Sequence, residues 1–286
     1  MLLTRIILKK SAMESVADQY IITDSIEGYG MQGSVFQAEH KLSKKLYVAK
    51  ITKLCDKKQQ ARFANEIKLL KLLGDCKNVI RLVDSFVAGA DGVLILERMP
   101  YDLMALIEND MLNKKQRVKI FTQVCKAIRD MHRKGIAHLD IKPENILVSI
   151  DFSSIKICDF GCSRLLPPSG LVKSESGTIM YSSPEYARGE ICDGKKADIW
   201  SLGILYHILL TDYFPYDFED INLQVATGTL VLLQSSLSDN QAQLIKKLLR
   251  ECPKERIDSE VVYSILRAEQ HAPEIFVKVY HKLKKN

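Results

Sequence analysis

Short apolar or alternating runs, separated by turn residues, dominate the chain from about residue 20 to residue 100. Runs of this kind predict β-strands. One helical pattern, from about residue 59 to 73, interrupts them, and Gly74 is placed to end it. The sequence GADG at 89–92 predicts a hairpin turn before the last strand. The five predicted strands cover residues 20–26, 35–40, 46–51, 80–87 and 93–99.

Helical spacing replaces this pattern after Pro100. One face of a predicted helix that stops at Gly135 carries Val118, Phe121, Cys125, Ile128 and His132. Residues 197–210 are apolar on nearly all sides. Two further helices are expected at about 239–250 and 258–269. The pattern therefore predicts an α+β chain, with a β-rich lobe of roughly 80 residues and a helical lobe about twice as large.

The composition is that of an ordinary globular protein, with 286 residues, 47% of them hydrophobic and 27% charged. A net charge of +6 is too small to predict binding to nucleic acid. The chain has no apolar stretch near ~20 residues and no ordered signal-peptide core, so no membrane contact is expected. The seven cysteines are scattered without a CxxC pair, which favours a reducing compartment, cytoplasmic or nuclear, over disulfides or a zinc site.

A glycine-rich sequence, GYGMQGSV at 28–35, lies between the first two predicted strands. Glycines let backbone amides approach phosphate oxygens closely. The same GxGxxG spacing also opens dinucleotide-binding folds, but there a helix follows, whereas a strand is predicted here. A lid over a nucleotide and a simple glycine-rich hairpin both remain compatible with this motif alone.

Lys50 lies in an apolar strand, where its ammonium group needs negative partners. Phosphate oxygens and a carboxylate can serve, and Glu66 on the following helix is the candidate carboxylate. A surface lysine on an edge strand would explain Lys50 alone. Strand alternation puts Val48 and Lys50 on one face and Ala49 on the other.

The strongest chemical signal is the segment IAHLDIKPENIL, with CDFG beginning thirteen residues after its Asn145. Asp140 is placed to orient a hydroxyl and accept its proton, and Lys142 to neutralise charge on a transferred phosphate. Asn145 and Asp159 supply the hard oxygens that Mg²⁺ prefers. Turn carboxylates would explain Asp140 or Asp159 alone, but not the whole set.

With these motifs in place, the chain from about Tyr20 to Arg267 resembles the eukaryotic protein kinases. The sequence GTIMYSSPE resembles the end of an activation segment, and DIWSLG the start of the buried central helix, whose Asp198 would hold the catalytic loop. Arg256 resembles the late arginine that pairs with the segment glutamate, here Glu185. The resemblance implies the two-lobed kinase fold, ATP and Mg²⁺ as cofactors, and transfer of the γ-phosphoryl group to serine or threonine of protein substrates.

The resemblance also implies individual roles. Lys142 with Thr178 is the serine/threonine pattern, and Leu96 would be the gatekeeper. The stacked apolar positions of an active enzyme would be Leu70, Leu82, His138 and Phe160. The catalytic residues would be Asp140, Lys142, Lys50, Glu66 and Thr178, with Asn145 and Asp159 as magnesium ligands. The ATP contacts would be Glu27, Gly28, Tyr29, Gly30, Met31, Gln32, Gly33, Ser34, Val35, Ala49, Lys50, Glu97, Met99 and Leu147.

The expected kinase domain covers residues 20–270, with an N-lobe of about 20–98 and a C-lobe of about 102–270. Residues 1–19 would be an N-terminal extension and 271–286 a C-terminal tail. A monomer is expected, and the short flanks suggest regulation by a partner or by abundance.

Three positions depart from the family pattern. Leu139 replaces the arginine that normally binds a phosphorylated activation-loop residue, and Ser174 is the candidate phosphosite. We therefore expect activity without phosphorylation of Ser174. Glu27 stands where an aliphatic residue usually covers the adenine, unless a bulge lets Ile26 take that place, and the glycine-loop tip lacks an aromatic residue. None of these changes removes a chemical group, so a catalytic enzyme is predicted.

Two other classes compete with this prediction. A non-catalytic scaffold of kinase shape is disfavoured because Lys50, Asp140 and Asp159 are all present. A small-molecule phosphotransferase is disfavoured by the GT…SPE segment, which presents peptides. Asp102 and Glu144 lie where kinases that prefer basic residues before the acceptor carry acids, which favours that preference slightly. Both could equally be solvated charges, and Asp102 could serve the ribose.

Overall fold

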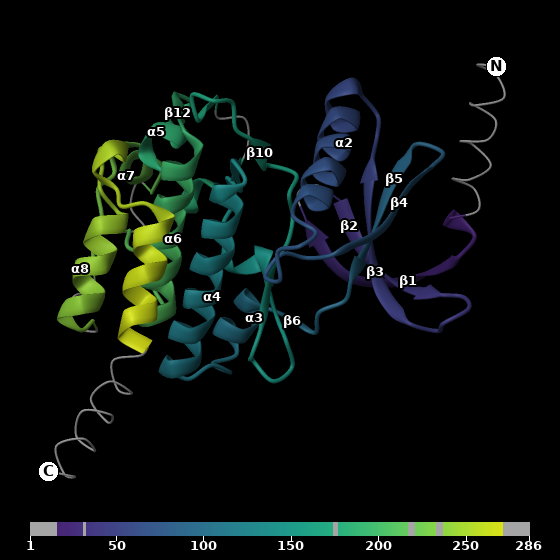
Figure 1. Ribbon diagram of the computed structural model, residues 1–286, viewed down its shortest axis with the longest axis horizontal. Helices are drawn as coiled ribbons and strands as arrows, with labels where there is room; N and C mark the ends of the chain where they lie inside the picture. Colours follow the sequence, from purple (N-terminus) through teal and green to yellow (C-terminus); the bar gives the residue numbers. More distant parts are fainter. Residues whose placement is uncertain (1–15, 31–32, 174–176, 217–220, 233–236, 271–286) are drawn as a thin grey trace, which may run out of the picture.

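The computed structural model describes residues 16–30, 33–173, 177–216, 221–232 and 237–270, with the backbone alone at 24–30. It has two lobes, a twisted sheet with helix α2 (Lys57–Leu72) beside it and a larger lobe of helices (Figure 1). The predicted two-lobed α+β fold is confirmed. Within the described ranges, every helix is too short or too polar to cross a membrane.

The small lobe is built on a five-stranded sheet in which all neighbouring strands are antiparallel, in the order β1-β2-β3-β5-β4. Gly89 and Ala90 alone connect the last two strands, and Gly89 has a φ of +60°. The hairpin turn predicted at 89–92 is shorter than expected, because residues 91 and 92 already belong to β5. Gly92 packs against the Phe63 ring, where a Cβ would clash. The strands are β1 Tyr20–Gly30, β2 Gly33–His40, β3 Leu46–Lys53, β4 Leu82–Ala88 and β5 Asp91–Glu97.

The two faces of this sheet have different neighbours. Ala49 and Ile95 are wholly buried in a small outer cluster with Phe86. Val48 packs against the main core instead, and Lys50 shares its face because residues two apart in a strand point the same way. The assignment of Ala49 to the adenine is therefore wrong. Val48 is the residue that this strand presents beside Lys50.

Helix α2 positions Glu66. It begins after Asp56, whose carboxylate accepts the Gln59 N–H at 2.7 Å as an N-cap. The helix ends at Leu72 with Leu73 as its C-cap, one residue before the predicted Gly74. Its buried face carries one carboxylate among apolar side chains, namely Phe63, Glu66, Leu69 and Leu70. A buried carboxylate of this kind needs a positive partner.

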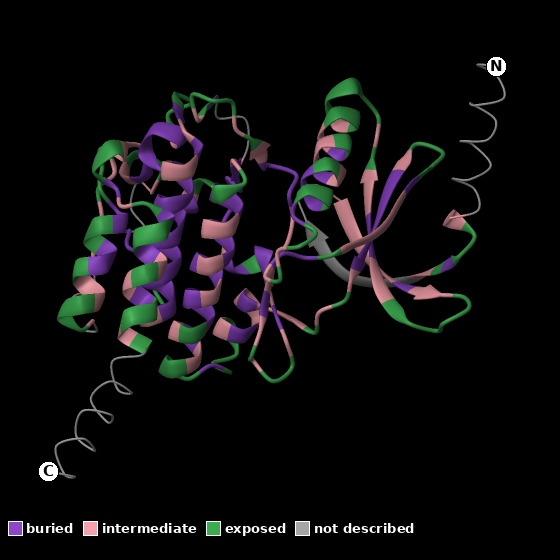
Figure 2. Ribbon diagram, in the orientation of Figure 1, coloured by how far each residue is buried: buried purple, intermediate pink, exposed green. Residues whose placement is uncertain are grey.

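The large lobe packs around α6 (Gly194–Thr211), which is buried on nearly all sides as predicted. Helix α4 (Lys114–Arg133) lies against it, with the Phe121 and Tyr206 rings stacked at 4.1 Å between centroids. Figure 2 shows the buried residues gathered along these two helices. The other helices are α3 Leu103–Glu108, α5 Pro184–Ala187, α7 Ile221–Thr227, α8 Asp239–Leu248 and a last one over 259–270.

Short strands place the predicted catalytic segments at the junction of the lobes. The catalytic loop runs from β7 to β8, and the CDFG sequence lies between β9 and β10. The sheets are β6-β8-β9, β7-β10 and β11-β12. Their bounds are β6 Tyr101–Asp102, β7 Ile136–Ala137, β8 Ile146–Val148, β9 Ile155–Ile157, β10 Arg164–Leu165, β11 Leu171–Lys173 and β12 Ile191–Asp193. The described residues include the 3₁₀ turns η1 Pro143–Asn145, η2 Ile179–Tyr181 and η4 Pro253–Glu255.

Candidate active site

Lys50, Glu66 and Asp159 form a buried group between the lobes, called here the ionic cluster. The Lys50 Nζ atom lies 2.7 Å from Glu66 Oε1 and 2.8 Å from Asp159 Oδ1. The Lys50 and Glu66 side chains are only 8% and 5% exposed, whereas that of Asp159 is 21% exposed. Glu66 Oε1 also accepts the Phe160 N–H at 3.3 Å. Lys50 is therefore not a surface lysine, and its two carboxylate partners come from both lobes.

The charges of the ionic cluster stabilise one another. Burial alone would lower the pKa of Lys50, but the carboxylates of Glu66 and Asp159 outweigh burial and hold that pKa above its ordinary value. Burial would raise the pKa of Asp159, but the charge and hydrogen bond of Lys50 keep it below its ordinary value. Lys50 and Asp159 are consequently both ionised at neutral pH.

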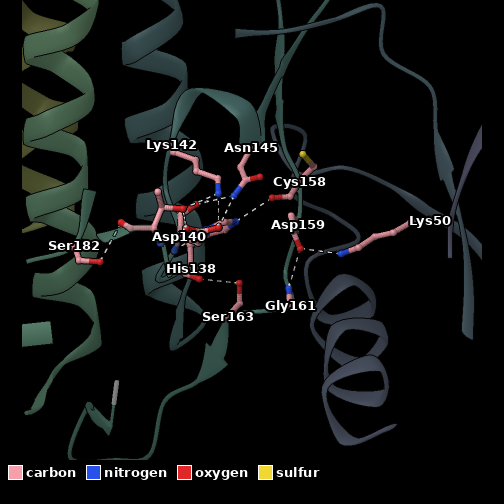
Figure 3. A network of polar contacts seen from close by, with 11 residues as sticks. Lys50, His138, Asp140, Lys142, Asn145, Cys158, Asp159, Gly161, Ser163 and Ser182 are labelled. Atoms are coloured by element: carbon pink, nitrogen blue, oxygen red, sulfur yellow. Dashed lines mark hydrogen bonds and ion pairs between the residues drawn. The ribbon is translucent and has the colours of Figure 1, made fainter. Parts of the chain in front are cut away.

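Asp140, Lys142, Asn145 and Thr178 form a second polar group on the large-lobe side (Figure 3). Asp140 Oδ1 accepts the N–H and the hydroxyl of Thr178, both at 3.0 Å. Asp140 Oδ2 accepts the Asn145 amide at 3.0 Å and lies 3.2 Å from Lys142 Nζ. Lys142 Nζ donates to the Thr178 hydroxyl at 2.7 Å. The Thr178 hydroxyl thus lies between Asp140, 38 positions before it, and Lys142.

Asp198 on α6 binds the backbone of the catalytic loop. Its wholly buried carboxylate accepts the N–H of His138 and the N–H of Leu139, both at 2.8 Å. Leu139 has a φ of +65°, which is costly for a residue with a Cβ, so these two bonds stabilise a strained turn. His132 also meets Asp198, at 2.9 Å from Nε2. The sequence predicted His132 only as part of the buried face of α4, because helical spacing does not show what a polar side chain will meet.

The CDFG segment turns Phe160 inward and Asp159 toward Lys50. Phe160 is wholly buried against the equally buried His138 ring, edge to face at 5.2 Å between centroids. His138 Nε2 lies 3.1 Å from the Cys158 carbonyl oxygen. Asp159 has a φ of +61°, which redirects the chain between these contacts. Leu70 and Leu82, the other two expected stack residues, belong to the same apolar core.

Leu139 lies in a second, uncharged group, called here the apolar cluster. It consists of Ala137, Leu139, Val172, Tyr186, Cys192 and Ala197, and Leu139 is only 7% exposed in it. Val172 and Cys192 are cross-strand partners in β11 and β12. Leu139 thus packs the catalytic loop against the activation segment. Ser174 lies outside the described residues.

The predicted ion pair at the end of the activation segment is present. Arg256 binds Glu185 with two parallel hydrogen bonds, of 2.6 and 2.7 Å, and both side chains are buried. The guanidinium also lies 5.0 Å from the centre of the Trp200 ring on α6. A bidentate pair of this geometry fixes the end of the segment to the core of the large lobe.

The glycine-rich sequence forms the turn between β1 and β2. The backbones of Gly28, Tyr29 and Gly30 pair with Val35, Ser34 and Gly33 in turn. A Cβ on Gly33 would lie 2.3 Å from the Ile51 carbonyl oxygen, so glycine is required there. The register shifts on both sides of Ile26, so Glu27 is the extra residue of a β-bulge, as the sequence allowed. Met31 and Gln32 lie outside the described residues.

The remaining expected nucleotide contacts lie where the lobes meet. Val35 is the cross-strand partner of Lys50, so both side chains share a face of the sheet. Met99 and Leu147 are half-buried against the main core. Glu97 ends β5, where its N–H donates to the Arg81 carbonyl at 3.1 Å and its carboxylate pairs with Lys156 at 2.9 Å. Glu97 therefore lies where the chain leaves the small lobe. The contact of its backbone with adenine stays a prediction.

A cavity of about 370 Å³ opens beside Tyr181, three residues after Thr178. Burial, with the nearby carboxylates of Glu144 and Asp140, raises the pKa of Tyr181. Asp102 caps α3 by accepting the Ala105 N–H at 2.8 Å, while Glu144 is exposed. The cavity is lined by Met104, Ile107, Glu108, Asp110, Tyr181, Ile208, Asp212 and Phe214.

Comparison with known proteins places this geometry in a family. The protein kinase domain model matches residues 22–267. The chain is 32% identical to SNF1-like protein kinase ssp2 of Schizosaccharomyces pombe, over 83% of this chain and 42% of that protein. It is 30% identical to serine/threonine protein kinase OSK3 of Oryza sativa, over 80% of this chain and 46% of that protein. It is 28% identical to smooth muscle myosin light chain kinase of Gallus gallus, over 86% and 13%. The chain spans less than half the length of these relatives, and it belongs to the protein kinase domain family.

Proposed function

We propose that this chain is an ATP-dependent protein serine/threonine kinase. The observation that carries the proposal is the arrangement around the Thr178 hydroxyl, which donates to Asp140 and accepts from Lys142. An incoming substrate hydroxyl needs the same two neighbours, an acceptor for its proton and a cation beside its oxygen. The ionic cluster supplies the groups that a nucleotide requires on the other side of the site.

In the proposed reaction, the substrate oxygen forms a bond to the γ-phosphorus while the bond from that phosphorus to the β,γ-bridging oxygen breaks. ADP leaves with the electron pair, and Asp140 accepts the hydroxyl proton. Lys142 neutralises charge on the phosphoryl group during transfer. Lys50, oriented by Glu66 at 2.7 Å, holds the nucleotide phosphates.

Asn145 and Asp159 fit a magnesium site, and Mg²⁺ is the cation that this family uses with ATP. Asp159 is ionised and partly exposed. The Asn145 amide nitrogen donates to the backbone oxygen and the carboxylate of Asp140, at 2.8 and 3.0 Å, so its amide oxygen points away from Asp140 (Figure 3). Carboxylate and amide oxygens are suitable magnesium ligands. Mg²⁺, when bound, offsets negative charge on the phosphate oxygens.

The deciding experiment measures ATP consumption and phosphopeptide formation by the purified chain, with and without Mg²⁺. Mixed serine- and threonine-containing peptides serve as acceptors. Activity that requires Mg²⁺ and disappears in Asp159→Ala, but persists in the control Asp151→Ala on an exposed loop, supports a kinase. A wild-type chain that binds MgADP but never forms phosphopeptide contradicts it and supports a scaffold.

We propose further that basic residues before the acceptor are preferred. The support is the exposed Glu144 next to the catalytic loop and the acidic side chains of the cavity beside Tyr181. Arg117 pairs with Asp110 and Asp212 and so offsets part of that charge. In a peptide array, lysine or arginine should raise phosphorylation at one or more positions before the acceptor. Glu144→Gln should weaken that preference, and an array without any basic preference would contradict the proposal.

We also propose that the enzyme is active without phosphate on Ser174. The support is the apolar cluster, in which Leu139 already packs the activation segment against the catalytic loop. A monomer in the cytoplasm or nucleus, with a regulatory partner, is likewise proposed. All seven cysteines are free, which suits a reducing compartment. Light scattering tests whether the protein is a monomer, and cell fractionation tests its compartment. Activity measurements on material co-purified from cells test the regulatory partner.

A further inference from the structure

One buried residue outside the predicted catalytic set joins three segments of the active site. Ser163 follows the CDFG sequence and is wholly buried. Its hydroxyl donates to the His138 carbonyl at 3.1 Å, on the catalytic loop (Figure 3). Its own carbonyl accepts the Asn65 side-chain amide at 3.0 Å, from helix α2 of the small lobe. We call these two hydrogen bonds the Ser163 junction.

The junction acts on the residues that matter most for the proposed reaction. Asn65 immediately precedes Glu66, the α2 carboxylate that orients Lys50. The His138 carbonyl immediately precedes the strained Leu139, whose N–H is held by Asp198 at 2.8 Å. Ser163 therefore fixes α2 through its backbone and the catalytic loop through its side chain.

The junction differs from the ionic cluster in what happens during turnover. Lys50 and Asp159 bind each other at 2.8 Å here, and both are needed by the nucleotide phosphates and the cation. Their mutual contact has to open when these ligands enter. The Asn65 amide and the Ser163 carbonyl have no role in the proposed reaction, so nothing in that reaction requires their bond to open.

On this basis we propose that Asn65 is a positioning residue that keeps α2, and with it Glu66, seated on the large lobe while Mg·ATP binds. The proposal rests on the kinase activity proposed above. Ser163 completes it by holding the catalytic loop to the same point. Arg164 also donates to the Ser163 carbonyl, at 3.0 Å, so loss of the Asn65 amide does not leave that buried acceptor without a partner. Substitution of Asn65 therefore tests the attachment of α2 without a large cost in folding.

The experiment compares Asn65→Ala and Asn65→Leu with wild type. Leucine keeps the shape of asparagine but cannot donate a hydrogen bond. In both variants the KM for Mg·ATP should rise about fivefold, the size expected for one hydrogen bond. The KM for the peptide should stay unchanged. Hydrogen exchange of the α2 amides should accelerate by a similar factor in the nucleotide-free protein. Lys68→Ala, on an exposed position of α2, is the matched control and should leave both readouts unchanged.

Ser163→Ala separates the two halves of the junction, because it keeps the carbonyl and loses only the hydroxyl. It should lower kcat and leave the KM for Mg·ATP unchanged. If both Asn65 variants keep the wild-type KM for Mg·ATP, or if leucine restores that KM while alanine does not, the proposal is wrong. A wild-type chain without any phosphotransfer would refute the proposed function instead. Hydrogen exchange and MgADP affinity then still test whether Asn65 holds α2.

Discussion

The ionic cluster and the apolar cluster hold their segments by opposite means. In the ionic cluster, the Lys50 ammonium meets two carboxylates at 2.7 and 2.8 Å, an arrangement that is costly away from water unless every charge is paired. In the apolar cluster, Leu139 packs among uncharged side chains and needs no partner of opposite sign. The charged groups can exchange their partners for phosphate oxygens and a cation, whereas the packed leucine has nothing to exchange.

The difference indicates where this protein can respond to ligands. In the proposed function, the ionic cluster is the side whose contacts a bound nucleotide would replace. The activation-segment side is held by packing that is complete without a phosphate. Asp140 lies on the catalytic loop and belongs to neither cluster. Substitutions in Asp140, in the apolar cluster and in the ionic cluster therefore test catalysis, stability and regulation separately.

The largest effect is expected from Asp140→Asn, which spares both clusters and removes the proton acceptor. The kcat for peptide phosphorylation should fall about 10²–10⁴-fold. Steady-state kinetics measure this loss, and the melting shift caused by MgADP should stay unchanged because Lys50, Glu66 and Asp159 are intact. Asp151→Asn is the control on an exposed loop. A variant that keeps most of the wild-type kcat would remove Asp140 from the mechanism.

Leu139→Ala should break the apolar cluster. Truncating a buried leucine costs about 2–4 kcal/mol of unfolding free energy through lost burial and the cavity left behind. Urea denaturation measures this change. Leu171→Ala is the matched control, because Leu171 lies in β11 beside Val172 but is 47% exposed, and it should cost less than about 0.5 kcal/mol. Equal costs in the two variants would show that Leu139 has no special packing role.

Glu66→Gln should weaken the ionic cluster while keeping its shape. A hydrogen bond between charged groups contributes about 1.5–3 kcal/mol, so kcat/KM for Mg·ATP should fall roughly 10- to 100-fold. Glu39→Gln, which alters the exposed pair with Lys44, should have no measurable effect. Because the folded pKa of Asp159 is lowered, its stabilisation is present at neutral pH and is lost as the pH falls through its ordinary value of 3.8 and below. Acid titration of Asp159→Asn should show less of this loss, since the carboxylate that titrates is absent.

The charge of the ionic cluster also reaches Cys158, the residue before Asp159. Burial and the negative charge of Asp159 raise the pKa of the Cys158 thiol, so little thiolate is present at pH 7.5. Alkylation by iodoacetamide should be at least about tenfold slower at Cys158 than at the exposed Cys55 and Cys252. Mass spectrometry of timed reactions gives the three rates. Comparable rates would show that Cys158 is accessible and that the pKa of its thiol is not raised.

The smallest effect is expected at Ser174. If packing alone positions the activation segment, Ser174→Ala should retain wild-type turnover within about twofold. Turnover should also be independent of phosphatase treatment of the native enzyme. A large loss in Ser174→Ala would show that a phosphate receptor other than residue 139 exists, and the contrast between the two clusters would fail.

Periodicity in the sequence predicted most elements to within a few residues, because apolar spacing follows the repeat of the helix or strand that buries it. Helix α4 and the buried α6 are the clearest cases. The error at Ala49 has a physical cause. Alternation separates the two faces of a strand, but it does not say which face meets the nucleotide and which meets a second cluster. Asp102 was similarly ambiguous, because a carboxylate before a helix can be a ligand or, as here, a cap.

The sequence by itself determined which chemical groups are available and in what order, including the leucine at position 139. Only the tertiary structure decided which of them meet. Asn65 and Ser163 are 98 residues apart, and Glu185 and Arg256 are 71 apart. Local spacing encodes which side of an element is apolar, whereas the partner of a buried polar group depends on how distant elements pack. That is why candidate catalytic residues could be named from the chain, while the hydrogen bonds that hold them became visible only in the fold.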